Sequence, residues 1–406
     1  MKVFPFSKQK ITELPVEIQL LIICTRLDTN ADILSQMEAL MLPGIQWSQV
    51  LSLSKQLGIH LLLYKHITNQ HLKHYIPDEY YQILQKDYQR QALQFLYLKR
   101  QIQEIKESFT REKVDFCLIK GAELLETIYT NEPVRSMSDI DILCRSDDIT
   151  SIQKTLSLLG YTQKPMHQSQ LMETLATQQK HFPPFFHEKR HTIEIHFNLF
   201  SGLSMDETYT QDVWMTAVKD QPYTQYHLSK EHHLLYMCNH LAYHIFSPRE
   251  GMVLYWFCDI FQWIHKYHDQ IDWYFFTRLS NNKLKKRTFF ILQLIHKELN
   301  APIPSHILTQ KNDQNDLTIA TIISNSIGES DYQKKRNVFH YYQQIWFNKH
   351  SDWSFKTRLG YWFRLFYPQS DYLKERYQIK KPFLTPLYKF FHPIFMIVRA
   401  FRRMIG

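Results

Sequence analysis

Apolar side chains recur at intervals of three and four residues through residues 16–111, which is the spacing of one face of an α-helix. The longest such stretch covers residues 79–107 and contains few helix-breaking residues. Its apolar positions include Ile83, Leu93, Leu96 and Ile102. The pattern therefore predicts a helical N-terminal region, residues 1–111, that contains one long helix.

Shorter apolar runs follow between residues 112 and 202, and they predict strands as well as helices. Strand patterns cover residues 114–119, 139–143 and 192–198, and helical patterns cover residues 123–129 and 149–159. Strands that are interspersed with helices in this way predict a compact core, residues 112–202, built on a small mixed sheet.

Helical periodicity returns after residue 202, over residues 231–246, 254–268 and 273–299. A Pro-rich stretch at residues 301–304 and a polar stretch at residues 311–316 predict a break after these helices. The overall expectation is a mostly helical α+β fold, in which the core lies between N- and C-terminal helical regions. We expect residues 203–300 to form the second wall of a cleft, and residues 301–406 to form a C-terminal helical region.

From Pro393 onward, apolar and basic residues separate onto two faces of a predicted helix. The apolar face carries Ile394, Ile397, Val398, Phe401 and Ile405, and the basic face carries Arg399, Arg402 and Arg403. Such a helix can lie on a membrane surface. It can also pack its apolar face on the protein with the arginines in water, which is the arrangement that we favour at this point.

Length and composition bound the class of protein. The 406 residues exceed the usual size of one domain, and 44% apolar with 15% aromatic residues excludes wholesale disorder. The 5 cysteines are scattered without a Cys-x-x-Cys pair, so neither a disulfide framework nor a zinc ribbon is indicated. Because no signal-peptide or transmembrane run is apparent, we expect a cytoplasmic protein, with membrane association through the C-terminal helix as an alternative.

The formal charge of +9 favours anionic partners, such as nucleotides, nucleic acid or membrane headgroups. Basic clusters at residues 283–287 and 334–336 could bind a polyanion. Short charge runs are more often solvated faces, however, and no aromatic RNA-stacking signature accompanies them. Nucleic acid is therefore the less favoured partner.

Acidic side chains are concentrated on the strand patterns of the core. Asp139 and Asp141 are two residues apart on a predicted strand and therefore point to the same face. Glu194 and His196 share one face of the last strand. Three carboxylates on neighbouring strands suit Mg²⁺ or Mn²⁺ and in-line phosphoryl displacement. We expect Asp139, Asp141 and Glu194 to be catalytic metal ligands, with Glu194 helping to deprotonate an acceptor. The exposed face of an edge strand is the alternative for Glu194. His196 could orient Glu194 or bind a metal, and a structural histidine is an equally good interpretation.

A lysine and a glycine follow the first predicted strand. Gly121 is one of only 9 glycines, which indicates a demand on the backbone at this turn. Close approach of a phosphate to the start of a helix would create that demand, and a plain strand-to-helix turn is the alternative. Lys120 and Arg135 could neutralise a triphosphate, Arg135 through its planar fork. We predict that Lys120, Gly121 and Arg135 bind the nucleotide.

His240 and His244 lie four residues apart on a predicted helix, a spacing that brings two zinc ligands onto one face. The residues between them lack the Glu of the metalloprotease pattern, so zinc is disfavoured. We interpret His240 together with Asp259 as a structural or pocket-lining pair between consecutive helices.

With these residues in place, the chain resembles the uncharacterised nucleotidyltransferase family within the DNA polymerase beta-like superfamily. The family pattern is Lys-Gly, then Arg-x-x-x-Asp-h-Asp-h, then Glu-h-His, where h is apolar. The matching positions are Lys120, Gly121, Arg135, Asp139, Asp141, Glu194 and His196. Flanking residues that also look similar are Trp47, His60, Tyr64, His240, Asp259 and Ile271 to Trp273.

The resemblance implies Mg²⁺- or Mn²⁺-dependent transfer of a nucleoside monophosphate from a nucleoside triphosphate, such as ATP, to an unidentified acceptor hydroxyl or phosphate. Ala122 stands where the wider superfamily commonly has Gly or Ser, so triphosphate contact at this turn would rest on backbone amides. Two alternatives stay open. One is a metal-dependent glycosyltransferase that uses a nucleotide sugar, and the other is a non-catalytic nucleotide-binding adaptor with the same fold.

Overall fold

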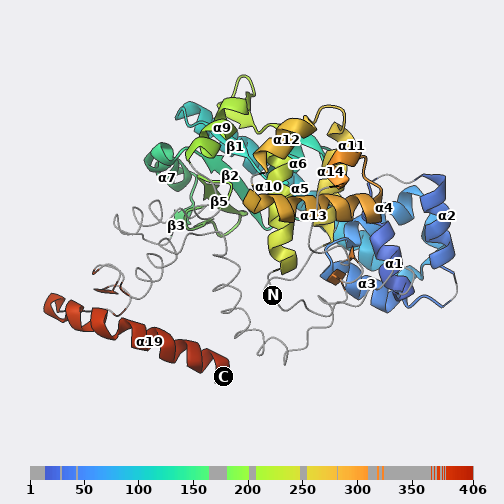
Figure 1. Ribbon diagram of the computed structural model, residues 1–406. Coiled ribbons are helices and arrows are strands. Elements are labelled where there is room, and N and C mark those ends of the chain that lie inside the picture. Colours follow the sequence, from blue (N-terminus) through green and yellow to red (C-terminus); the bar gives the residue numbers. More distant parts are fainter. Residues whose placement is uncertain are drawn as a thin grey trace.

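Helices surround a mixed sheet in the computed structural model, which confirms the mostly helical α+β fold that the sequence predicts (Figure 1). The residues that the structure describes are 14–27, 30–42, 44–163, 181–200, 207–246, 254–280, 282–309, 318–319, 322–323, 367, 370, 373–374, 377, 379 and 381–405. The polar stretch at residues 311–316 and the basic cluster at residues 334–336 lie outside these described residues.

The N-terminal region is helical, as predicted. Its elements are α1 (Val16–Ile23), α2 (Ala31–Leu40), α3 (Trp47–Gln56), α4 (His60–Asn69), the 3₁₀ turn η2 (Leu72–Tyr75) and α5 (Asp78–Arg111). The side chain of Asn30 caps α2 by accepting a hydrogen bond of 2.9 Å from the backbone N–H of Ile33.

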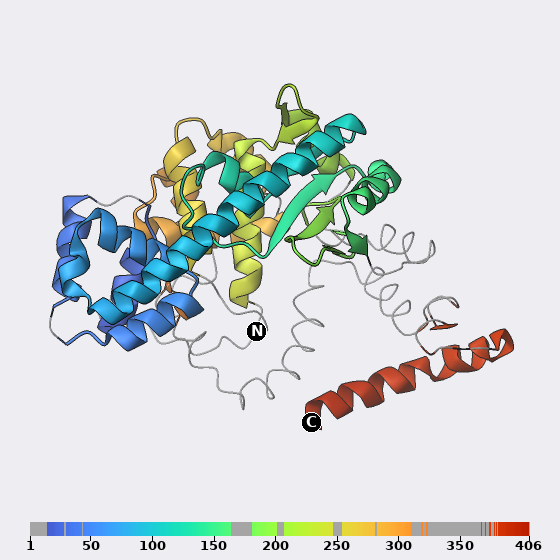
Figure 2. The ribbon, with the colours of Figure 1, turned by 180° about the vertical axis from the view of Figure 1, so that it is seen from behind.

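The long predicted helix is α5, which has 34 residues and runs from the N-terminal helices past the sheet (Figure 2). Its buried stripe includes Leu84, Phe95, Leu98, Ile102, Ile105 and Phe109. Of the four apolar positions that the sequence analysis named in this helix, only Ile102 belongs to the buried stripe. Ile83, Leu93 and Leu96 lie on the exposed side of the helix.

The sheet has seven strands in the order β3-β4-β5-β2-β1-β7-β6. Their bounds are β1 (Phe116–Leu118), β2 (Asp139–Cys144), β3 (Thr162–Gln163), β4 (Phe185–Phe186), β5 (Thr192–His196), β6 (Val218–Lys219) and β7 (Gln225–His227). Antiparallel and parallel pairs both occur, since β1 is antiparallel to β2 and parallel to β7. The sheet therefore continues past residue 202, where the sequence placed the end of the core. The division into four regions stays a prediction.

Helices also follow and cover these strands. They are α6 (Gly121–Thr127), α7 (Ile149–Leu158) after the turn η3 (Ser146–Asp148), α9 (Glu207–Thr216), α10 (Lys230–Phe246), α11 (Tyr255–Tyr267), α12 (Trp273–Leu279), α13 (Asn282–Leu299) and α14 (Ser305–Leu308). α10 packs against α11, α12 and α13. A hydrogen bond of 2.9 Å from Asn239 Nδ2 to Thr288 Oγ1 joins α10 to α13.

Two further findings concern the C-terminal half. The single helix predicted over residues 273–299 is two helices, because α12 ends at Leu279 and Ser280 leaves the helical conformation. The turn η5 (Pro382–Leu384) precedes α19 (Thr385–Ile405), which extends the predicted C-terminal helix in the N-terminal direction. Among the described residues, no helix is both long and apolar enough to cross a membrane.

A buried histidine on α10 predicts that acid destabilises the fold. The ring of His233 packs on Trp263 with a centroid separation of 4.4 Å, and neither ring nitrogen has a hydrogen-bond partner among the described residues. Burial, and to a smaller extent the charge of His227, lowers the pKa of His233 to about 3. An unfolded histidine titrates near pH 6.5, so below that pH the unfolded state gains a proton that the native state cannot bind.

We therefore expect His233 to lower the free energy of unfolding by about 1 kcal/mol per pH unit as the pH falls from roughly 6 to 4. The variant His233→Leu should show a pH slope that is smaller by this amount in urea unfolding. His268→Leu, at an exposed position, is the matched control and should keep the slope of the natural chain. Equal slopes for His233→Leu and the natural chain would contradict the prediction.

Candidate active site

The centre of the site is the pair of parallel strands β2 and β5. Their register places Asp141 beside Glu194, and the strand alternation puts Asp139 and His196 on the same face. The alternate residues, such as Ile140 and Ile193, are fully buried on the other face. Burial of one apolar face thus fixes the strands so that the acidic residues share the opposite face, as the sequence pattern predicts.

Asp141 is the most connected carboxylate of the site. Its Oδ1 accepts a hydrogen bond of 2.7 Å from Lys120 Nζ and lies 2.8 Å from His196 Nε2. His196 Nε2 is also 3.6 Å from Glu194 Oε2. Because a carboxylate only accepts, Nε2 is the donor in its contact with Asp141.

Three side chains of this cluster could hold a metal ion. One ligand atom each from Asp141, Glu194 and His196 lie within 4.8 Å of one another. Asp139 begins β2, and its carboxylate accepts a hydrogen bond of 3.1 Å from Ser138 Oγ. Asp139 is outside the group of three, so its role as a metal ligand stays a prediction.

Electrostatic interactions shift the pKa values of these acids in different directions. Burial acts to raise the pKa of Asp141, but the charge of Lys120 and the hydrogen bond from His196 outweigh it and hold the pKa far below its usual value. The neighbouring ring of His196 also lowers the pKa of Glu194. Burial and the charge of Asp141 raise the pKa of Asp139. A cation at this position would therefore meet at least two ionised carboxylates near neutral pH.

The turn between β1 and α6 carries Lys120 and Gly121. The unusual backbone conformation belongs to Lys120, with φ 50° and ψ −129°. Gly121 is required for another reason, because a Cβ there would lie 2.8 Å from Arg135 Cζ and closer still to Arg135 Nη1. A buried guanidinium thus takes up the space that a side chain at residue 121 would need. Whether a phosphate also approaches Gly121 stays a prediction.

Arg135 is held in place by Asp259 on α11. Arg135 Nε lies 3.1 and 3.0 Å from the two carboxylate oxygens of Asp259, and Arg135 Nη2 lies 2.9 Å from Oδ2. Tyr129 donates a hydrogen bond of 2.7 Å to Asp259 Oδ1. Both charged side chains are buried. This network ties the turn at Gly121 to the helical wall formed by α11.

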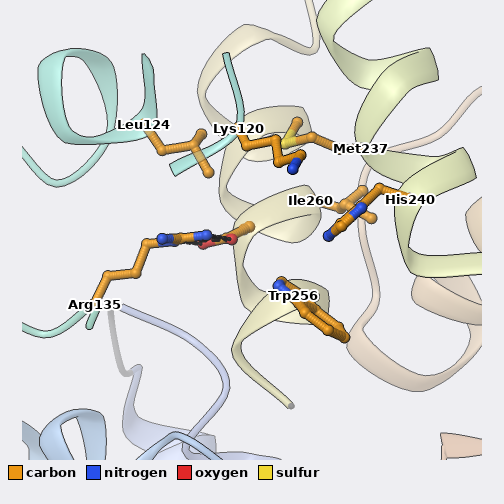
Figure 3. A pocket seen from close by; sticks show the side chains of 8 residues that line it. Lys120, Leu124, Arg135, Met237, His240, Trp256 and Ile260 are labelled. Atoms are coloured by element: carbon orange, nitrogen blue, oxygen red, sulfur yellow. Dashed lines mark hydrogen bonds and ion pairs between the residues drawn. The ribbon is translucent and has the colours of Figure 1, made fainter. Parts of the chain in front are cut away.

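A pocket adjoins the metal-binding candidates. Its lining residues are Lys120, Leu124, Arg135, Met237, His240, Trp256, Asp259 and Ile260. In Figure 3, Arg135 enters from one side of this space, and His240 and Trp256 lie on the other. His240 and Asp259 therefore line one pocket, as the sequence suggested. The carboxylate of Asp259 contacts Arg135 and Tyr129, while the ring of His240 packs on Trp256 at 5.2 Å.

Sequence reasoning missed one residue of the site, Tyr236 on α10. Burial raises the pKa of its hydroxyl far above the usual value, opposed by Lys120 and assisted by the charges of Asp141 and Glu194. Tyr236 thus lies within the electrostatic reach of the metal-binding candidates. Its position in an apolar helical run offered no signal that could have singled it out.

A substitution at Gly121 tests the geometry of this turn. Gly121→Ala forces the new Cβ against the guanidinium of Arg135, which cannot swing away without leaving Asp259. We expect the free energy of unfolding to fall by about 1–3 kcal/mol, as in other overpacked cores. In a double-mutant cycle with Arg135→Ala, measured by urea unfolding, the cost of Gly121→Ala should shrink. If Gly121→Ala lowers the free energy of unfolding by the same amount in the Arg135→Ala variant, the residue at 121 does not clash with Arg135.

We compared the chain with models of known protein families. Residues 43–300, more than half of the chain, match the family described as uncharacterised nucleotidyltransferase. The chain therefore belongs to the uncharacterised nucleotidyltransferase family, and the resemblance noted from its motifs is confirmed. Comparisons with curated proteins and with solved structures gave no significant match.

Proposed function

We propose that this protein is a metal-dependent nucleotidyltransferase, which moves a nucleoside monophosphate from a nucleoside triphosphate to an acceptor hydroxyl or phosphate. The observation that carries the proposal is the cluster of Asp141, Glu194 and His196 beside Lys120, in a chain of this family. A divalent ion supplies charge neutralisation and orients the triphosphate in such chemistry.

The donors of this cluster fit a hard cation. Asp141 and Glu194 present carboxylate oxygens, which are the ligands that Mg²⁺ and Mn²⁺ prefer, and we propose that both hold the ion together with Asp139. His196, with a proton on Nε2, orients the two carboxylates from the side. The lowered pKa of Glu194 keeps this carboxylate ionised, so we propose that it also helps to deprotonate the incoming hydroxyl.

Lys120 is the residue that we assign to the triphosphate. Burial opposes its charge, but Tyr236 and Asp141 raise its pKa, so the ammonium stays protonated. It also lines the pocket, where it can meet a phosphate that approaches the carboxylates. For Arg135, phosphate binding stays a prediction. Its bidentate pair with Asp259 argues for a positioning role instead, since the fork is already occupied.

The proposal can be tested with purified protein, each α-labelled nucleoside triphosphate, Mg²⁺ or Mn²⁺ and a cell extract as the source of acceptor. Label should pass to an acceptor, with pyrophosphate release, in the natural chain but not in Asp139→Asn/Asp141→Asn. Asp269→Asn, which changes an exposed aspartate after α11, is the matched control. No transfer by a folded natural chain with any nucleotide would overturn the proposal.

The same assay separates the two alternatives. Transfer of the sugar from a labelled nucleotide sugar would support a glycosyltransferase, which also binds its donor through paired aspartates. Nucleotide binding without transfer of either group would support an adaptor. We propose the cytoplasm as the compartment, because all five cysteines are free thiols and each is buried.

A further inference from the structure

The helix α19 has two different sides. One side packs on a short preceding segment of the chain, where Tyr377 Oη lies 2.7 Å from His392 Nδ1. The ring of Tyr377 also packs on Tyr388 and Phe395, with centroid separations of 5.2 and 5.5 Å. Thr385 and His392 are buried on this side. The helix therefore already has an internal partner along its polar and aromatic positions.

The other side is apolar and faces away from that partner. Its residues are Phe383, Leu387, Phe390, Phe391 and Ile394, which follow one another at intervals of one, three or four positions. Phe383 is 75% exposed and Phe390 is 70% exposed, and the other three are exposed as well. These five residues, which we call the outer stripe, are not packed on the protein body. Of the apolar face that the sequence predicted, Ile394 is 50% exposed, whereas the side chains of Ile397, Val398, Phe401 and Ile405 lie outside those that the structure describes.

Charge identifies the surface that fits the outer stripe. Residues 381–406 contain 5 lysines and arginines and no aspartate or glutamate. Lys381 and Lys389 lie beside the outer stripe in the sequence, and Lys381 is exposed. A protein partner with an apolar groove would cover the apolar outer stripe, but it would leave the basic residues unexplained. An anionic membrane surface satisfies both features, because acyl chains accept the apolar side while lipid headgroups neutralise the basic residues.

We propose that α19 docks this protein on the surface of membranes rich in anionic phospholipid, with the helix lying in the membrane plane. No described helix can span a bilayer, and both views show α19 outside the layers of sheet and helices (Figures 1 and 2). Phe383, Leu387, Phe390, Phe391 and Ile394 enter the boundary between headgroups and acyl chains. The side of α19 that carries His392 and packs on Tyr377 then faces away from the membrane. This inference does not depend on the proposed transfer reaction.

Flotation of the full chain with vesicles tests the proposal. The natural chain should float with vesicles of phosphatidylcholine plus phosphatidylglycerol, and should stay in the bottom fraction with phosphatidylcholine alone. Added salt should weaken the recovery, because it screens the headgroup charge. Phe390→Ser/Ile394→Ser should reduce the bound fraction about tenfold or more, since two large apolar side chains no longer leave water.

The control variant is Leu158→Ser/Met215→Ser, which changes two exposed apolar residues outside α19 and should float like the natural chain. Thermal unfolding of both variants shows whether the fold is kept. The proposal is overturned if the natural chain stays at the bottom with anionic vesicles, or if the control loses flotation as much as the α19 variant. The natural chain could instead form a dimer in solution that dissociates in Phe390→Ser/Ile394→Ser, without floating with any vesicle. This result would show that the outer stripe binds a second copy of the chain.

Discussion

Replacing Asp141 by Asn is expected to lower the rate of nucleotidyl transfer by about a thousandfold or more. Loss of one carboxylate from the proposed ion site should remove several kcal/mol of transition-state stabilisation, and each 1.4 kcal/mol is about tenfold in rate. Asp141 is the acid that both Lys120 and His196 contact, so no neighbour can substitute for it. Pyrophosphate release with a saturating nucleotide and Mg²⁺ measures the rate.

The fold must be separated from the chemistry in this experiment. Asp141→Asn leaves the partly buried ammonium of Lys120 without its hydrogen-bonded countercharge, so some stability should be lost as well. Lys120→Met/Asp141→Asn removes both charges and should recover thermal stability while transfer stays absent. Retention of more than about a tenth of the natural rate by a folded Asp141→Asn chain would show that this carboxylate does not hold the ion.

Asp259→Ala is expected to cause the largest loss of stability, about 3–5 kcal/mol in urea unfolding. Arg135 then keeps a charged guanidinium in a buried position, and the hydroxyl of Tyr129 loses its acceptor. A loss of this size is a large share of the 5–15 kcal/mol by which typical domains are stable. The same variant should also reduce transfer, because Arg135 no longer supports the turn that carries Lys120.

A paired replacement provides the control for this effect. In Arg135→Met/Asp259→Leu neither charge is left buried, so the loss of stability should be much smaller than in Asp259→Ala. The cost in Asp259→Ala would then come from an uncompensated charge and not from altered packing on α11. If Asp259→Ala unfolds within about 1 kcal/mol of the natural chain, the ion pair does not contribute as the buried geometry implies.

Much of the fold follows from local periodicity. α5 was predictable because its buried stripe repeats with helical spacing. The apolar residues Leu93 and Leu96 fit the helical pattern too, but in the structure they are exposed. Which apolar residues are covered depends on the neighbours that fold against the helix. The short strands β3, β4 and β6 have two residues each, too few for any alternation to be recognised. They are strands because β4, β5 and β7 offer them hydrogen-bonding partners.

Some features of the candidate site could also be predicted from the sequence, and others depend on contacts that form only in the folded chain. Strand alternation was enough to put Asp139 and Asp141 on one face, and the structure adds that Asp141 lies beside Glu194. The partner of Arg135 could not be predicted, because Asp259 is 124 residues away and no periodicity connects them. Gly121 was recognised as special, but the cause is a guanidinium that only the folded chain brings to this turn.

The parallel pairing of β2 and β5 has a consequence for synthesis on the ribosome. Asp141 and His196 are 55 residues apart in the chain, with α7 and two short strands between them. At about 5–20 residues per second, a nascent chain carries Asp141 for roughly 3–11 seconds before His196 has been made. During that interval Lys120 is the only one of these partners already synthesised. The proposed cation site is therefore incomplete until β5 has emerged, and a chain interrupted before then should transfer no nucleotide.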